Sequence, residues 1–289
     1  TAGLFTVLKI LSKKKKIITT PFSYISGVNA AHILNYEIIY SDIANDLNIC
    51  PEKLKKVTLN KADIIMPTHV YGNPCQIEKL LNIAKKNNIK IIYYASHCFG
   101  VNYKNRSILK YGDASVMSFQ ATKIFNCVEG GLIHFRNYSD LLEAKKFINI
   151  GFSKQQSKPS EGLNFKLSEL NCAWGLSLLR RMPVIIKKRK KLYLEYMKKL
   201  NQNITNQYSI KSNYSYFPII FKSENKLKKC MRLLNKSNIF PRRYFYPSLN
   251  NLRHLKSNTN TMKSNSISKK ILCLPLSEYM KLNEVSYIS

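Results

Sequence analysis

The sequence of 289 residues lacks paired cysteines and long apolar runs. Its seven cysteines are scattered, none stands in a CxxC pair, and their number is odd. This pattern argues against a disulfide framework or a zinc site, and it favours reduced thiols in a cytoplasmic protein that holds no metal. No apolar run reaches the roughly 18 residues that a membrane-spanning helix needs, so no such helix is predicted.

Acidic residues are also scarce. The sequence has 16 Asp and Glu against 47 Lys and Arg, which gives a formal net charge of +31. Such a charge can indicate a polyanionic partner such as nucleic acid. The lysines are spread along a chain rich in Lys, Asn and Ile, however, and no zinc-finger spacing or RNA-binding aromatic signature accompanies them. We favour compositional drift and expect no nucleic-acid partner; the alternative is a nucleic-acid-binding protein on an old enzyme scaffold.

An initiator methionine is absent. The first residues, TAGLFTVLKILSKKKK, carry their charge after the apolar run rather than before it. That order is the reverse of a signal peptide, so none is predicted. Because the sequence opens as if inside a helix, we expect it to be a fragment of a longer chain.

What the sequence does contain is an alternation of apolar strands with helices over its first 137 residues. The clearest helical pattern covers residues 76–88, where Ile77, Leu80, Leu81 and Ala84 share one face. Such alternation predicts an α/β fold with a largely parallel sheet. The predicted strands are residues 16–22, 36–43, 62–70, 89–96, 114–120 and 131–136.

After about residue 137 the pattern turns helical. We predict a large domain over residues 1–184 and a small C-terminal domain over residues 185–289. Residues 153–162 are expected to be a polar loop, and residues 256–270 are polar enough to be a disordered insert. The remaining predicted elements are helices at 138–150, 168–182, 185–200 and 224–237 and a strand at 214–221.

Lys123 follows the strand at 114–120 in the segment SFQATKIFNCVEGG. A lysine at the exit of a buried strand can be desolvated, which lowers its pKa and makes the amine nucleophilic toward carbonyls. It is also one of 47 basic residues, and its spacing alone favours an ordinary lysine. The joint occurrence of several segments in order changes that interpretation.

Those segments resemble the DegT/DnrJ/EryC1/StrS family of pyridoxal 5′-phosphate (PLP) sugar aminotransferases. The likeness runs almost end to end and is greatest for enzymes that aminate dTDP-4-keto-6-deoxyglucose, the viosamine type, with the 3-keto branch next. The matching segments are TTPFSY (19–24), PTHVYGNPC (67–75), ASHCFGV (95–101), RSILKYGDAS (106–115), SFQATKIFNCVEGG (118–131), GLNFKLSE (162–169) and PRRYFYPSL (241–249).

The resemblance implies the PLP-dependent transferase fold type I. Its large domain has a mostly parallel seven-stranded sheet, and a small α+β domain follows at the C-terminus. It also implies a homodimer with its sites at the interface. The activity implied is transfer of an amino group from glutamate to a nucleotide-linked keto-deoxysugar, for surface polysaccharide or glycan biosynthesis.

Cofactor-binding roles follow from the same resemblance. Lys123 matches the lysine that binds PLP covalently and later moves the proton. Ser118 matches a serine on the cofactor phosphate, and Thr1 and Ala2 match the end of a phosphate-binding loop. Backbone N–H groups at a helix N-terminus suit such a dianion.

Further roles fall on residues around the ring and the substrate. Tyr24 matches an aromatic residue that stacks on the pyridine, and His97 matches a position that bonds the ring hydroxyl. Asn164 matches an asparagine that reaches the phosphate from the partner subunit. Arg242 and Arg243 are candidate clamps for carboxylate or phosphate groups, since guanidinium binds both bidentately. Singly, each of these residues also has an ordinary explanation as a core, turn or surface residue.

Two positions depart from the family pattern. Tyr94 stands where the family has an aspartate that pairs with the pyridine nitrogen, and Gln120 stands where close relatives have histidine. A tyrosine hydroxyl has a pKa near 10, so it can hydrogen-bond the nitrogen but supplies no charge. The resemblance also implies that the phosphate-binding loop begins before Thr1, so we expect this loop to be truncated here. The alternative to an active aminotransferase is therefore a catalytically impaired or inactive relative.

Overall fold

A six-stranded sheet forms the centre of the protein in a computed structural model. The structure describes residues 1–12, 14–54, 59, 62–153, 158–200, 205–206, 213–255, 257 and 259–289. The strands run in the order β2 (Glu37–Tyr40), β1 (Lys16–Thr19), β3 (Ile64–Met66), β4 (Lys90–Tyr94), β7 (Ala114–Ser118) and β8 (Gly131–Phe135). All neighbours are parallel except β7 and β8.

The α/β architecture with a mostly parallel sheet is therefore confirmed, and each of the six strands lies inside a predicted range. The described residues supply six strands to this sheet rather than the seven expected. Within them, β8 pairs only with β7 and forms one edge of the sheet, while β2 forms the other edge.

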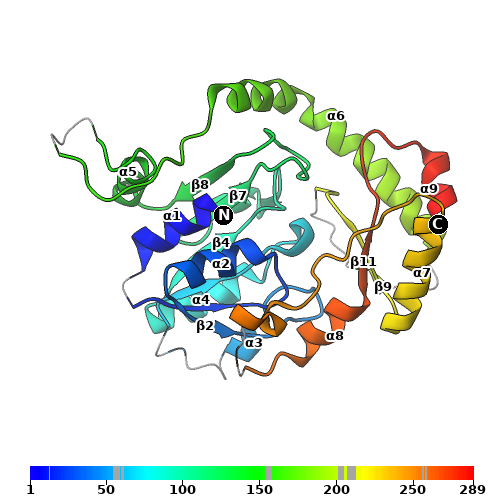
Figure 1. The fold of residues 1–289 in the computed structure, drawn as a ribbon, viewed down its shortest axis with the longest axis horizontal. Coiled ribbons are helices and arrows are strands. Elements are labelled where there is room, and N and C mark those ends of the chain that lie inside the picture. Colours follow the sequence, from blue (N-terminus) through cyan, green and yellow to red (C-terminus); the bar gives the residue numbers. More distant parts are fainter. Residues whose placement is uncertain are drawn as a thin grey trace.

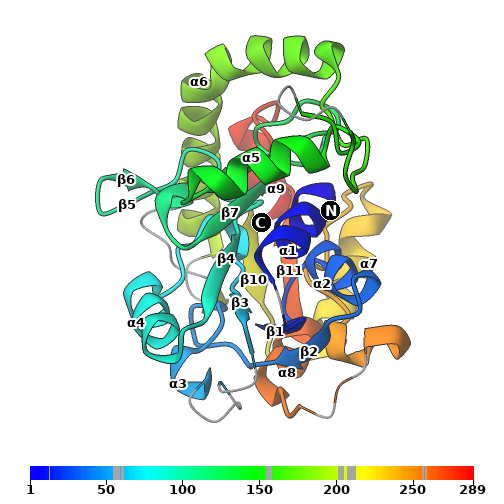
Figure 2. The ribbon, with the colours of Figure 1, turned by 90° about the vertical axis from the view of Figure 1, so that its left-hand side faces the viewer.

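Helices cover both faces of the sheet (Figures 1 and 2). Ile17 and Ile64 pack with α1 (Ala2–Leu11) and α2 (Ile25–Ile33) on one face. Ile18 and Ile65 pack with α4 (Ile77–Asn87) on the other. Successive side chains of a strand point to opposite faces, which is why the near-continuous apolar runs of the sequence fill two layers. Each fully buried isoleucine contributes about 1.5–3 kcal/mol to folding.

Smaller elements complete the first half of the chain. They are α3 (Pro51–Leu54), the hairpin of β5 (Asn102–Tyr103) and β6 (Arg106–Ser107), α5 (Tyr138–Phe147), and the 3-10 turns Val70–Gly72 and Ile108–Lys110.

One long helix, α6 (Glu169–Leu200), occupies the region where two helices are predicted. The predicted break near residue 184 is wrong, because the 32-residue helix continues through Pro183. Met182 and Ile185 flank this proline and pack with Phe125 in one cluster, which holds both halves in place. The helix runs along the top of the molecule in Figure 1 and then turns downward, as expected for a proline inside a helix. The division into domains at residue 184 stays a prediction.

The C-terminal region has its own antiparallel sheet in the order β11 (Ile271–Leu274), β10 (Phe217–Ile220), β9 (Thr205–Asn206). The second half of α6 packs on it through Leu192 and Tyr196. The other helices here are α7 (Glu224–Lys236), α8 (Met262–Lys270) and α9 (Leu282–Ile288), and 3-10 turns cover Leu249–Asn251 and Arg253–Leu255.

Helix α8 corrects the predicted disordered insert at residues 256–270. The buried carboxylate of Asp42 accepts hydrogen bonds from the backbone N–H groups of Lys263 (2.9 Å) and Ser264 (2.8 Å) and from the Ser264 hydroxyl (2.6 Å). A carboxylate in this place satisfies N–H groups at the start of the helix and stabilises the positive end of its dipole. Residues 256 and 258 of the predicted insert lie outside the described residues.

Among the helices that the structure describes, none combines the length and the apolar character of a membrane-spanning segment.

Candidate active site

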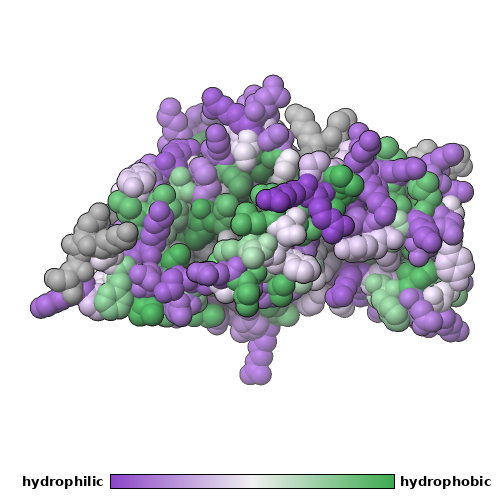
Figure 3. All heavy atoms as spheres, turned by 90° about the horizontal axis from the view of Figure 1, so that it is seen from above, coloured by the Kyte–Doolittle hydropathy of each residue, from purple (hydrophilic) through white to green (hydrophobic). Residues whose placement is uncertain are grey.

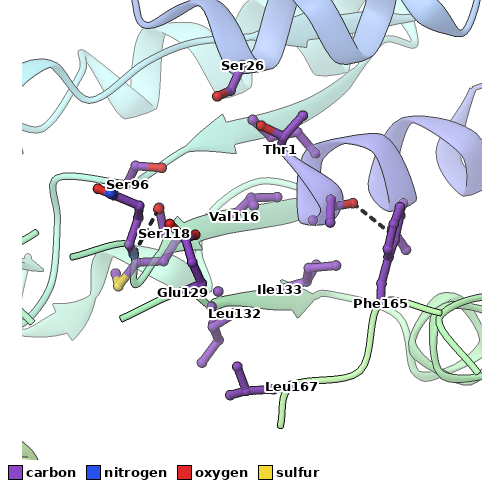
Figure 4. A pocket seen from close by; sticks show the side chains of 18 of the residues that line it. Thr1, Ser26, Ser96, Val116, Ser118, Glu129, Leu132, Ile133, Phe165 and Leu167 are labelled. Carbon is purple, nitrogen blue, oxygen red and sulfur yellow. Dashed lines mark hydrogen bonds between the residues drawn. The ribbon is translucent and has the colours of Figure 1, made fainter. Parts of the chain in front are cut away.

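A cavity of about 1110 Å³ opens where the carboxyl ends of β4 and β7 meet the N-terminal ends of α1 and α2. Figure 4 shows side chains from these elements pointing into it. The carboxyl ends of parallel strands are the usual place for ligands in α/β proteins. Six of the predicted site residues line this cavity, namely Thr1, Ala2, Tyr24, Ser118, Lys123 and Arg242, and so do the two departing positions, Tyr94 and Gln120.

Lys123 stands in a tight turn directly after β7. Its backbone N–H donates to the Gln120 carbonyl (2.9 Å), and the Gln120 side chain accepts from the N–H (2.9 Å) and hydroxyl (2.6 Å) of Thr122. Gln120 thus holds the turn that presents the lysine. Burial lowers the pKa of Lys123 to about 8, and its Nζ lies 5.9 Å from the centre of the Tyr24 ring. The amine is therefore partly uncharged near neutral pH.

The N-terminal end of α1 faces the same cavity through Thr1, Ala2 and Gly3. The first N–H groups of a helix have no partner within it, and the helix dipole places positive potential there. A Cβ on Gly3 would lie 2.9 Å from Val116 Cγ1, so glycine lets α1 approach β7 closely. Ser118, the last residue of β7, adds a hydroxyl group. This end of the cavity suits a phosphate dianion.

Aromatic and hydroxyl side chains form another part of the wall. Tyr24 precedes α2 and is 47% exposed, so its ring is available to stack on a ligand. Tyr94 ends β4 and is buried, and burial raises its pKa to about 12, against hydrogen bonds with Ser96 and Ser26. This part of the wall is uncharged at neutral pH.

His97 is buried and is not among the residues that line the cavity. Its Nδ1 accepts the backbone N–H of Tyr71 (3.1 Å), and its ring lies parallel to Phe245 with centres 5.9 Å apart. Burial, and then the charge of Lys123, lowers the pKa of His97 well below its usual value. The imidazole is therefore neutral, and with Nδ1 accepting, the proton is on Nε2.

The two neighbouring arginines lie apart. Arg242 lines the cavity. The Arg243 guanidinium instead bonds Glu224 (3.2 Å) and the Lys269 carbonyl (3.0 Å), and it lies 3.4 Å from the centre of the Tyr246 ring. The structure brings only Arg242 to the site within one chain.

Asn164 also lies outside the cavity. It is exposed, and its backbone forms an isolated bridge with Asn149. The resemblance gives it a role on the partner subunit, which a single chain does not display.

Several residues that line the cavity were not predicted as site residues from the sequence. Ser26 and Ser96 each stand two residues after a tyrosine that lines the wall, a spacing that could have pointed to them. Asn171 gave no signal; its side chain reaches from α6 to donate to the Glu129 carbonyl (2.6 Å). The remaining ones include Glu129, Lys145, Lys166 and Tyr244.

Comparisons with known proteins find similar sequences and structures. The profile of the DegT/DnrJ/EryC1/StrS aminotransferase family matches residues 1–289. A dTDP-4-amino-4,6-dideoxy-D-glucose transaminase of Shigella dysenteriae is 33% identical over 299 residues, which cover 100% of this chain and 82% of the relative. Its Escherichia coli namesake is 33% identical over 98% of this chain and 80% of its own length. Helicobacter pylori PseC, an aminotransferase involved in the biosynthesis of pseudoaminic acid, superposes with a TM-score of 0.92 and 26% identity over 99% of this chain and 81% of that structure.

Proposed function

Because the chain belongs to the DegT/DnrJ/EryC1/StrS aminotransferase family, we propose that it is a PLP-dependent aminotransferase of a nucleotide-linked keto-deoxysugar. The proposed sugar is of the dTDP-4-keto-6-deoxyglucose type, with glutamate as the amino donor. One observation carries the proposal: an amine with a pKa of about 8 shares a cavity with a helix N-terminus suited to phosphate.

The residues present fit PLP at its phosphate and its aldehyde. The N-terminal end of α1, with Gly3 close against β7, and the Ser118 hydroxyl would hold the phosphate. The Tyr24 ring, which lines the cavity, would cover one face of the pyridine. Bound there, PLP supplies the conjugated ring that accepts the electron pair of a carbanion.

The chain's own residues supply the proton transfers and the orientation. The uncharged fraction of Lys123 can attack a carbonyl, and its Nζ can later accept a proton from one carbon and return it to another. Arg242, on the cavity wall, would orient the glutamate carboxylate or the substrate phosphates through paired hydrogen bonds. The Gln120 hydrogen bonds to Thr122 keep the lysine in place during both steps.

A homodimer in the cytoplasm is part of the proposal. Large apolar side chains are exposed on the first half of α6, among them Leu170 (84%), Leu176 (65%) and Trp174 (56%). Figure 3, which views the molecule from the side of α6, shows apolar surface between the polar side chains. Contiguous exposed apolar surface marks interaction sites. A second copy seated here would cover these residues and could deliver its Asn164 to the phosphate.

Tyr94 favours a second candidate, a relative that binds PLP but transfers amino groups slowly or not at all. One experiment separates the two. The purified chain is mixed with PLP, its visible spectrum is recorded before and after glutamate, and borohydride followed by peptide mass spectrometry locates any adduct.

An active aminotransferase gives a yellow protein, an adduct at Lys123 and loss of colour with glutamate. The impaired relative gives the same adduct but keeps its colour. Lys123→Ala should abolish the adduct, whereas Lys79→Ala, at an exposed lysine paired with Glu52, should not change it. An adduct spread over surface lysines, with none at Lys123, contradicts both candidates.

A further inference from the structure

Tyr94, at the carboxyl end of β4, brings an uncharged phenol to the cavity wall. Among the described residues that line the cavity, Glu129 is the only acid. Figure 4 shows Glu129 beside Ser118 and away from Ser26. Tyr94 instead belongs to the wall formed with Ser26 and Ser96. A ligand group that meets this wall therefore meets hydroxyls and no carboxylate.

Packing holds Tyr94 in this place. The side chain is 6% exposed, and a Cβ on Gly27 would lie 3.4 Å from its ring. The side chains of Ser26 and Ser96 lower the pKa of the Tyr94 hydroxyl, against the larger effect of burial. Because burial raises its pKa to about 12, the hydroxyl stays protonated and remains a hydrogen-bond donor over the working pH range.

The pKa shifts of two basic groups, Lys123 and His97, indicate that this region disfavours positive charge. Burial lowers the pKa of Lys123 to about 8 and that of His97 well below its usual value. Desolvation disfavours the charged form of any base, and no acid is among the causes of either shift. A third base placed among these groups experiences the same penalty.

We infer that Tyr94 holds the cofactor's ring nitrogen in its uncharged form, as the acceptor of a phenolic hydrogen bond. This inference rests on the proposed function. A hydrogen bond to the neutral form of a base lowers the base's pKa further, so donor and desolvation act in the same direction. An uncharged ring withdraws electrons less strongly than a cationic one, which slows proton removal from the substrate while leaving the phosphate anchor and Lys123 intact.

The test is the ¹⁵N chemical shift of PLP labelled at the ring nitrogen and bound to the whole chain, from mildly acidic to mildly basic pH. The wild-type protein should give the shift of an unprotonated pyridine at every pH. Tyr94→Phe should keep the signal in the unprotonated range, displaced only by loss of the hydrogen bond, and should weaken PLP binding about three- to tenfold, since one neutral hydrogen bond is lost. Tyr94→Asp should move the signal to the protonated position. Tyr93→Phe is the matched control, because the buried Tyr93 hydroxyl has no partner among the described residues and should affect neither measurement.

A protonated signal in the wild-type protein, with a borohydride-stable adduct at Lys123, overturns this inference and leaves the proposed function standing. Absence of any adduct at Lys123 overturns the proposed function, and the inference with it. The wild-type and Tyr94→Phe measurements decide the question even if the aspartate variant fails to fold.

Discussion

Lys123 should react with aldehydes at a pH where other lysines of the protein are almost inert. The experiment varies the pH and compares the wild-type protein with Gln120→Ala, which removes the two hydrogen bonds that hold the turn of Lys123. Burial lowers the pKa of Lys123 to about 8 from an ordinary value of 10.5. At about pH 7.5, roughly a quarter of the Lys123 amine is uncharged, against roughly 0.1% for an ordinary lysine.

That difference is about 240-fold in reactive amine. Part of it is lost because a less basic nucleophile is intrinsically weaker, so we expect Lys123 to react about 10 to 100 times faster than an exposed lysine. Reductive methylation with formaldehyde, quantified for each lysine by peptide mass spectrometry, measures this directly. Labelling of Lys123 should be half-maximal near about pH 8, because the uncharged fraction rises through the pKa.

Lys79, which is exposed and paired with Glu52, serves as the internal comparison. Gln120→Ala should move the Lys123 midpoint to higher pH, because a loosened turn exposes the amine to water. A Lys123 midpoint equal to that of Lys79 would refute the link between burial and reactivity, and would remove the main support for a nucleophilic lysine.

Three further predictions concern stability, cofactor affinity and assembly. Asp42→Asn should lower the free energy of unfolding in urea at neutral pH by about 2–4 kcal/mol, whereas Glu52→Gln at an exposed pair should have no measurable effect. Hydrogen bonds outweigh burial and hold the pKa of Asp42 at about 2, below its ordinary 3.8. The carboxylate therefore contributes about 2 kcal/mol to the free energy of unfolding above about pH 4, and this contribution is lost as the pH falls toward 2. An Asp42→Asn variant whose stability depends on pH as that of the wild-type protein does would contradict this. Ser118→Ala should weaken PLP binding about 10- to 100-fold, measured by equilibrium dialysis, because a hydrogen bond to a charged phosphate is lost. Trp174→Glu should shift sedimentation toward monomer while Leu194→Glu, on the far half of α6, should not; equal behaviour would exclude the proposed dimer surface.

The sheet could be predicted because each strand carries its own signal. Apolar runs such as Ile64–Met66 are bounded by turn-forming or polar residues, and burial on both faces makes them continuous. The predicted range 62–70 overshoots because Pro67 and the residues after it are also buried, although they belong to the turn that follows β3. Apolar patterning reports burial, and it does not report where the backbone leaves the sheet.

The features missed by sequence depend on partners far along the chain. Helix α8 is polar, and its start is fixed by Asp42, which precedes Ser264 by 222 residues. Arg243 bonds Glu224, which stands 19 residues before it, and the local sequence does not distinguish Arg243 from Arg242. The segments that carry Lys123, Ser118 and Tyr24 are recognisable together because they resemble, in order, the segments of a known family, and local propensity alone does not reveal this.

The unbroken course of α6 couples two distant parts of the molecule mechanically. Asn171 near its start contacts the backbone at the cavity, while Arg189 in its second half holds Glu278 and the Leu276 carbonyl. Pro183 cannot donate the usual backbone hydrogen bond, and the packing of Met182 and Ile185 on Phe125 supports the helix at this point. The backbone of Arg242 bridges Cys273 of β11, so a rotation of the C-terminal sheet would move this guanidinium relative to Lys123.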